Sequence, residues 1–216
     1  MIEPCFEESH VDQPSTGPPV ELDVIRRQAR KAWSWFEETV SDVTAEQANW
    51  WPPGTANSIG TTYLHVVINT DVEINRLIFR REPLIETRWG GDVGQGVPYD
   101  PEEFDAWTRH VAVDWEVLRQ YGLAVHDQFL GSLDDLTDAH LSMPVDMTRS
   151  GLGMWEGRDL YELHGSNHPH IHGGEIASLK GLQGGIGWAE SDAFRRPSPF
   201  RTSTNPVGAG NASGVW

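Results

Sequence analysis

Apolar residues recur every three or four positions in four stretches of the chain, the spacing at which they share one face of a helix. The first stretch covers residues 20–43, and Pro18 and Pro19 mark its start. Its apolar line consists of Leu22, Ile25, Ala29, Ala32, Phe36 and Val40. We therefore predict an amphipathic helix that buries a single stripe.

The second stretch follows a connector that contains the helix-breaking segment Pro52-Pro53-Gly54. Asn57 or Ser58 can cap a helix that we expect to continue to about Arg81. Its core line consists of Leu64, Val67, Asp71, Ile74 and Ile78. His65 lies at the edge of this line.

The third stretch shows the most regular period and predicts one helix from about Pro101 to Phe129. Its line alternates steps of three and four, close to a bundle seam: Phe104, Trp107, Val111, Trp115, Leu118, Gly122, Val125 and Phe129. The fourth stretch predicts a helix from about Arg158 to Leu182 that ends at Gly184 and Gly185.

No stretch alternates apolar and polar residues as a half-buried strand does. Four helices joined by long connectors predict an all-α, up-down four-helix bundle. We expect the bundle to occupy residues 19–186, between a flexible N-terminal tail over residues 1–18 and an extended or disordered tail over residues 187–216. Both tails are rich in proline and polar residues.

The formal net charge of −16 argues against nucleic acid as a partner, because binding to phosphates needs a basic surface. It also disfavours an anionic membrane surface. The chain has one cysteine, Cys5, in the acidic N-terminal stretch, where we expect no catalytic role. We find neither an apolar run long enough to cross a bilayer nor a signal peptide, so we expect a cytoplasmic protein.

Four of the nine histidines lie in the segment HGSNHPHIH, residues 164–172. On a helix, His168 and His172 are one turn apart on the same face, which lets two imidazoles bind one metal ion. That face continues into the apolar residues Ile176 and Leu179, so the two rings should point into the bundle. A solvated histidine-rich turn is the alternative.

Pro169 interrupts this helix, because it has no amide to donate to the carbonyl of Gly165. The helix is then either kinked or begins again near Asn167. His164 and His168 form a competing pair at the same spacing, but a kink would swing His164 away. His170 lies on the opposite face, where we expect it to be exposed.

A catalytic tetrahedral site takes about three protein ligands and keeps one position open. His65 is the natural third ligand, because it borders the apolar face of another helix and is followed by Asn69 and Glu73 at one and two turns. We predict that His65, His168 and His172 bind one divalent metal ion. A set with His164 in place of His172 is the rival.

The sequence around these histidines resembles the DinB family of DinB/YfiT-like metalloenzymes over roughly residues 20–185. The family pattern H-x-x-x-H-x-G-[EQ]-[IL] is matched by His168, His172, Gly174, Glu175 and Ile176, and one further histidine lies on the second helix. The connector is similar too, with Thr44-Ala45-Glu46-Gln47 ahead of Pro52-Pro53-Gly54.

The resemblance implies a four-helix bundle in which three histidines hold a divalent metal, usually zinc or nickel, with water completing the site. Relatives include S-transferases that depend on mycothiol or bacillithiol, and maleylpyruvate isomerases that depend on mycothiol. Related iron-dependent sulfoxide synthases carry an H-x-x-x-H-x-E motif; here Glu175 comes one residue later, which argues against an oxygen-dependent role.

Three functions follow. The first is a transferase in which the metal lowers the pKa of a low-molecular-weight thiol cosubstrate that attacks an electrophilic small molecule. Glu175 is the candidate catalytic acid, which orients a ligand or manages a proton. The second is a metal-dependent hydrolase with Glu175 or Glu73 as base. The third is a non-catalytic metal-binding bundle.

Two expectations concern partners. Arg76, Arg80 and Arg81, at the end of the second helix, could bind an anionic cosubstrate, although a solvated helix end explains them equally well. Relatives often pair, so we also expect a homodimer.

Overall fold

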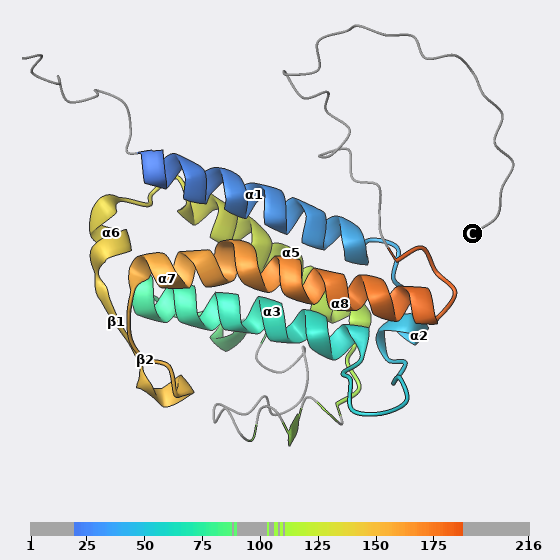
Figure 1. Ribbon diagram of the computed structural model, residues 1–216. Coiled ribbons are helices and arrows are strands. Elements are labelled where there is room, and N and C mark those ends of the chain that lie inside the picture. Colours follow the sequence, from blue (N-terminus) through green and yellow to red (C-terminus); the bar gives the residue numbers. More distant parts are fainter. Residues whose placement is uncertain are drawn as a thin grey trace, which may run out of the picture.

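The computed structural model describes residues 20–87, 89, 103, 106, 107, 109 and 111–187. This part of the chain is mainly helical (Figure 1). The long elements are α1 (Val20–Val40), α3 (Ile59–Glu73), α5 (Trp115–Ser132) and a continuous run formed by α7 (Gly157–Glu162), η4 (Leu163–Asn167) and α8 (His168–Leu182). Cys5 and most of both predicted tails lie outside the described residues.

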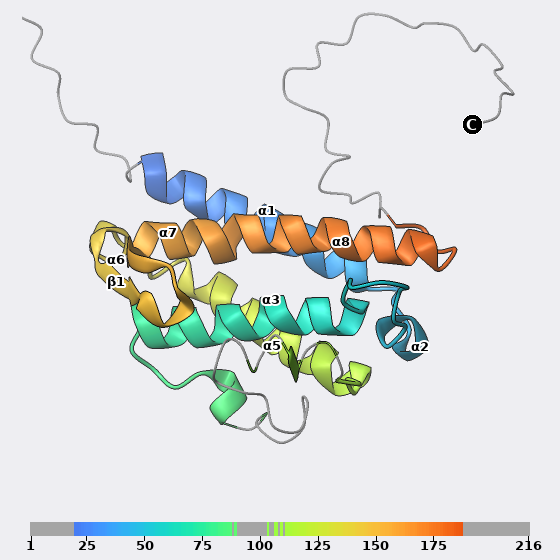
Figure 2. The ribbon, with the colours of Figure 1, turned by 60° about the horizontal axis from the view of Figure 1, so that its bottom comes forward.

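The four long helical segments lie side by side in both views (Figures 1 and 2). Helix α1 packs against α8 and η4, and α3 packs against both α5 and α8. Their apolar stripes meet in one core that includes Phe36, Leu64, Leu118 and Ile176, none of which is exposed. None of the described helices combines the length and the apolar character that crossing a bilayer requires.

Helix α1 is shorter than predicted, because it ends at Val40 rather than Val43. The connector after it contains a helical turn, α2 (Ala45–Ala48), that the sequence reading missed. Thr44 and Gln47 form a capping box: the Thr44 hydroxyl accepts from the Gln47 amide, and the Gln47 side chain accepts from the Thr44 amide. The pattern Thr-x-x-Gln was visible in the sequence as this start signal.

Helix α3 begins as predicted, because Ser58 caps it by accepting from the amide of Thr61. Its end differs from the prediction. The helix widens into a π-helical turn, η1 (Ile74–Ile78), and ends at Ile78 rather than near Arg81; Arg80 follows with a φ of 51°. A 3-10 turn, η2 (Leu84–Glu86), follows.

The single third helix predicted over residues 101–129 is wrong, because residues 111–114 are not helical and α5 begins at Trp115. Asn49 holds the break open: its side-chain amide donates to the carbonyl of Val113, and its side-chain oxygen accepts from the Val113 amide. Asp114 then caps α5 at the amide of Val117. The apolar period continued through the break because Val111 and Val113 still pack against the core.

Between the third and fourth predicted helices we expected a long connector without strands, and residues 134–157 differ from this expectation. They contain α6 (Asp138–Ser142) and a hairpin of β1 (Pro144–Met147) and β2 (Gly153–Glu156), separated by the short turn η3 (Thr148–Ser150). The strands are antiparallel, with Val145 opposite Trp155. Each strand has four residues, too few for an alternation that the sequence could reveal.

The last helical run resolves the conflict at Pro169 with a π-helical turn. Helix α8 begins again at His168, with Pro169 in its first turn, and the His168 amide donates to Leu163, five residues back. With hydrogen bonds between residues five apart, the amide of residue 169 would donate to the carbonyl of His164, but proline has no amide hydrogen. The indole nitrogen of Trp33, a fully buried residue of α1, donates to that carbonyl at 2.8 Å.

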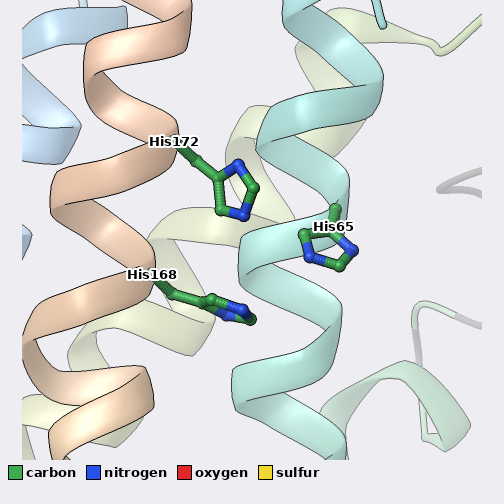
Figure 3. Close-up of side chains that lie close together, drawn as sticks. All are labelled: His65, His168 and His172. Atoms are coloured by element: carbon green, nitrogen blue, oxygen red, sulfur yellow. The ribbon is translucent and has the colours of Figure 1, made fainter.

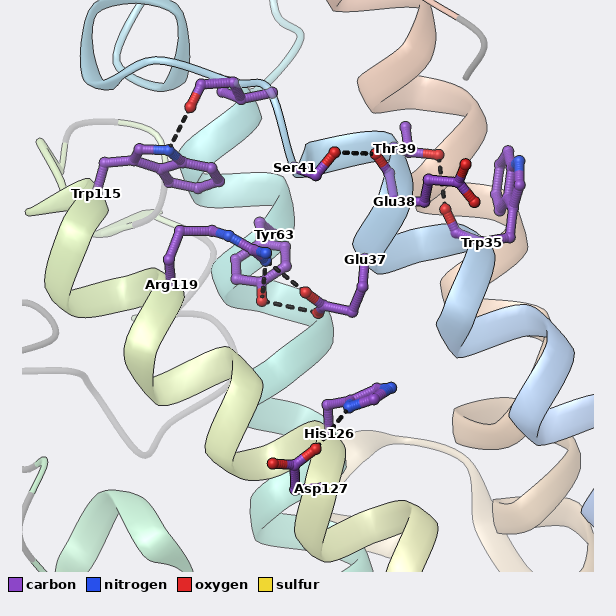
Figure 4. A network of polar contacts seen from close by, with 11 residues as sticks. Trp35, Glu37, Glu38, Thr39, Ser41, Tyr63, Trp115, Arg119, His126 and Asp127 are labelled. Atoms are coloured by element: carbon purple, nitrogen blue, oxygen red, sulfur yellow. Dashed lines mark hydrogen bonds and ion pairs between the residues drawn. The ribbon is translucent and has the colours of Figure 1, made fainter. Parts of the chain in front are cut away.

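Two networks connect buried polar groups of the core. In the first, the Tyr63 hydroxyl donates to Glu37 at 2.8 Å, and Arg119 donates to both of them at 2.6 Å, which joins α3, α1 and α5 (Figure 4). Burial and the neighbouring Glu37 carboxylate raise the pKa of Tyr63 well above its usual value. The hydroxyl therefore stays protonated and donates.

The second network surrounds Asp71, a residue of α3 that is 1% exposed. Its carboxylate accepts four hydrogen bonds, from the side chains of Asn75 and Tyr121 and from the amides of Leu84 and Ile85. Full satisfaction explains how a carboxylate occupies a position that the sequence pattern assigned to the core.

The adjacent glycines Gly173 and Gly174 should respond in opposite ways to alanine. A Cβ at Gly173 would lie 2.3 Å from Cζ3 of Trp35, whose buried indole packs between α1 and α8, whereas a Cβ at Gly174 meets no described atom within 4 Å. We expect Gly173→Ala to lower the free energy of unfolding by roughly 1–3 kcal/mol and Gly174→Ala to leave it unchanged or raise it by up to about 1 kcal/mol. Urea titration of both variants measures this, and equal effects would contradict the packing described here.

A double-mutant cycle tests the compensation between Trp33 and Pro169. Trp33→Phe leaves the His164 carbonyl without its donor and removes buried volume, which should cost roughly 2–4 kcal/mol of unfolding free energy. Pro169→Ala supplies an amide that can reach the same carbonyl, so it should be more favourable by about 1 kcal/mol in the Trp33→Phe background than in the wild type. Additive effects in chemical denaturation would show that the two residues do not serve the same carbonyl.

Candidate metal centre

Three imidazoles from two helices converge in the middle of the α3–α8 interface (Figure 3). His65 comes from α3, and His168 and His172 come from α8. One nitrogen of each ring lies within 4.8 Å of one nitrogen of each of the others. The ring centroids are 4.9 to 5.2 Å apart. The structure thus brings together the three residues that the sequence singled out.

The local structure explains the convergence. Restarting the helix at His168 places His168 and His172 one turn apart within regular α-helix, so both rings project toward α3. His65 is half-buried at the edge of the α3 stripe and lies opposite the gap between them. The break at Pro169 therefore leaves the pair of α8 histidines in register.

The spacing suits a divalent metal ion. Imidazole nitrogens bind zinc at about 2.0–2.1 Å, which places the ligands of a tetrahedral site about 3.3 Å apart. Nitrogens that already lie within 4.8 Å of one another reach that spacing by small side-chain rotations. Three imidazoles leave the fourth position to water or a substrate atom.

His168 is held in the neutral form that a metal ligand needs. Burial, followed by the neighbouring His164, His65 and His172, lowers the pKa of His168 to about 2. Its Nδ1 is buried and has no hydrogen-bond partner among the described residues. A half-buried imidazole with a buried, unused nitrogen in a histidine cluster fits a site built to hold a cation.

Polar neighbours orient the other two rings. Glu175 lies 2.7 Å from Nδ1 of His172, an arrangement that leaves Nε2 of this ring for a metal. Nδ2 of Asn69, one turn after His65, lies 3.3 Å from Nδ1 of His65. If the side-chain amide of Asn69 is flipped, its oxygen accepts a hydrogen bond from that nitrogen. Of the roles considered for Glu175, orienting a ligand matches this geometry directly.

A kink at Pro169 would have swung His164 away from the site, but the structure shows the other alternative, a helix that begins again at His168. The π-helical turn η4 carries His164 inward, where it is fully buried and packs against His168 with ring centroids 5.2 Å apart. Its Nε2 lies 2.8 Å from Glu73 and its Nδ1 lies 3.2 Å from Thr70. Both nitrogens therefore have partners on α3, which separates His164 from the three converging ligand atoms. His170 is exposed, as predicted.

Of the three arginines at the end of the second helix, Arg80 is exposed, and Arg76 and Arg81 are engaged elsewhere. Arg76 pairs with Glu86, and Arg81 donates to Asn75. Arg76 also lies roughly 15 Å along the helix axis from His65, at about 1.5 Å of rise per residue. These side chains serve the local structure after α3 rather than the histidine cluster.

Comparisons with known proteins agree with this arrangement. The profile of the DinB superfamily matches residues 28–176, which include all three converging histidines. The crystal structure of a conserved protein from Enterococcus faecalis is similar in fold, with a TM-score of 0.57 at 20% sequence identity over 74% of this chain and 95% of that chain. No curated protein matches significantly. The match to the superfamily profile covers well over half of the chain, which therefore belongs to the DinB superfamily.

Proposed function

We propose that this protein is a metal-dependent enzyme that transfers a small-molecule thiol to an electrophile. The observation that carries the proposal is the convergence of His65, His168 and His172, with their ligand nitrogens within 4.8 Å of one another. We propose zinc or nickel as the divalent ion, because both accept imidazole ligands.

The residues of the site have separate roles in this proposal. His65, His168 and His172 would hold the ion, which when bound supplies a positive charge that lowers the pKa of a thiol or water in its open position. Glu175 keeps the His172 ring in one orientation. His172 keeps 19% of its side chain exposed, so a ligand can approach the cluster from solvent.

A hydrolase is the second candidate, and the positions of the acids favour the transferase. A hydrolase needs a carboxylate free to take a proton from water. Glu175 is bound to His172 and Glu73 is bound to His164, so both candidate bases already hold histidines in place. A thiol bound to the ion would have a lowered pKa and could release its proton to solvent water without such a base.

The up-down order predicted for the four long helical segments is wrong, because α3 with its continuation η1 runs parallel to α5: Tyr63 contacts Arg119, and Asn75 contacts Gln128 further along both. We further propose that α1, α3, α5 and the α7–α8 run form a frame that presents the histidines from two neighbouring members. This frame would act on a small molecule in the cytoplasm. The carboxylates of Glu73 and Glu175 flank the cluster, while Arg76 and Arg81 are engaged away from it. This distribution favours a thiol with little negative charge.

Replacing a ligand tests the metal site. We expect His172→Ala to lose stoichiometric metal, because two imidazoles form a much weaker site. His170→Ala is the matched control on the same helix; it is exposed and should keep one metal ion per chain. Elemental analysis of the purified proteins measures both. Full occupancy in His172→Ala would refute the proposed ligand set.

The thiol-transferase activity needs its own assay. Metal-loaded protein should accelerate consumption of an electrophile such as a chlorinated dinitrobenzene with one member of a panel of low-molecular-weight thiols, and removal of the metal by a chelator should abolish the effect. Hydrolysis of an ester in the absence of thiol, together with no turnover of the electrophile with any thiol of the panel, would instead support the hydrolase.

We also propose a homodimer, supported by exposed apolar side chains on α8: Ile171 is 59% and Leu182 is 69% exposed. Light scattering at micromolar concentration should give about twice the chain mass of 24.1 kDa. A mass near that of a single chain would contradict the dimer.

A further inference from the structure

His168 differs from the other two histidines in how its ring is held. Asn69 contacts Nδ1 of His65, and Glu175 contacts Nδ1 of His172, so each of those rings is tied by a polar neighbour. The Nδ1 of His168 is buried without a hydrogen-bond partner in the described part of the chain. Packing against its neighbours must therefore set the rotation of this ring.

One of those neighbours is itself immobile. The ring of His164 meets that of His168 edge to face, with centroids 5.2 Å apart and planes at 83°. His164 is fully buried and is held by α3 on both nitrogens, through Glu73 at 2.8 Å and Thr70 at 3.2 Å. The Thr70 hydroxyl also donates to the carbonyl of Val66, which fixes its own position.

The backbone of His164 is fixed as well. Its carbonyl accepts from the Trp33 indole at 2.8 Å, so α1 holds the main chain while α3 holds the side chain. Packing alone would be satisfied by an apolar residue at this position, and burying a histidine beside a carboxylate is costly without a specific gain.

We infer that His164 is a positioning residue for the metal site: it is not a ligand, and its immobilised ring sets the orientation of His168. His164 is held by Glu73, Thr70 and Trp33, and its ring packs on that of His168. It would thus orient His168 by packing, whereas Glu175 orients His172 by a hydrogen bond. This inference rests on the proposed metal site and assigns a role to four residues outside its ligands.

The test uses Co²⁺ as the probe, because its visible absorption reports both occupancy and coordination geometry. We expect His164→Ala to bind one Co²⁺ per chain at saturation, with affinity reduced about tenfold or more and altered absorption bands. His164→Phe restores a ring against His168 but loses the hydrogen bonds to Glu73 and Thr70, so it should recover only part of the affinity. His170→Ala should match the wild type in both.

Thermal unfolding of the metal-free variants separates positioning from general damage. If His164→Ala does not fold, Glu73→Gln is the substitute variant. Glu73 is partly exposed, and a glutamine can still accept a hydrogen bond from His164. This bond is weaker without the charge, so a reduced Co²⁺ affinity is expected here too. A purely structural role would lower the melting temperature of metal-free His164→Ala yet leave its Co²⁺ bands unchanged.

Two results would overturn the inference. Unchanged Co²⁺ affinity and bands in His164→Ala would show that His168 needs no such support, and loss of all binding at saturation would make His164 a ligand. Absence of Co²⁺ binding in the wild type would overturn the proposed metal site itself, so the two failures are distinguishable.

Discussion

Pro169 has no amide hydrogen, and the last long helix must pass through it while its histidines stay in the core. An unsatisfied carbonyl in the core is costly, so the chain needs another donor there. In the π-helical turn η4, the carbonyl that lacks a backbone donor is that of His164, and the indole nitrogen of Trp33 in α1 donates to it instead. The same turn leaves His168 and His172 in regular helix and carries His164 inward behind them.

Hydrogen bonds among other buried polar groups also join the helices. Glu37 and Arg119 meet around the hydroxyl of Tyr63, and the four donors to Asp71 tie α3 to α5 and to the turn after α3. Lys180, which is 2% exposed, donates to the carbonyl of Thr39 and pairs with Asp42, which joins the end of α8 to the end of α1. Each network links helices that are distant in sequence, so the pair of helices that carries the histidines has a defined relative position.

Much of this structure was predictable from local pattern, and the failures have physical causes. Ser58 and the α3 stripe followed from capping and period, and the spacing of His168 and His172 was enough to place both rings on one face. The break before Trp115 was missed because Val111 and Val113 within it still pack against the core, and its cause is Asn49, a distant partner. The position of His164 stayed open, because the sequence marks Pro169 as a disruption but cannot tell a kink from a π-helical turn in which Trp33 supplies the missing donor.

The supporting shell was partly visible. Asn69 and Glu73 stood at one and two turns from His65 in the sequence, and the structure shows them contacting His65 and His164 respectively. Which histidine each would meet depended on the antiparallel alignment of α3 with α8, which no single helix encodes.

A crystal structure of the metal-loaded protein, with anomalous diffraction recorded at the absorption edge of the bound element, tests the central claim most directly. We predict one anomalous peak per chain, about 2.0–2.1 Å from a nitrogen of each of His65, His168 and His172, with His164 still paired to Glu73. A peak bound to His164, or no peak between α3 and α8 in protein that carries stoichiometric metal, would contradict it.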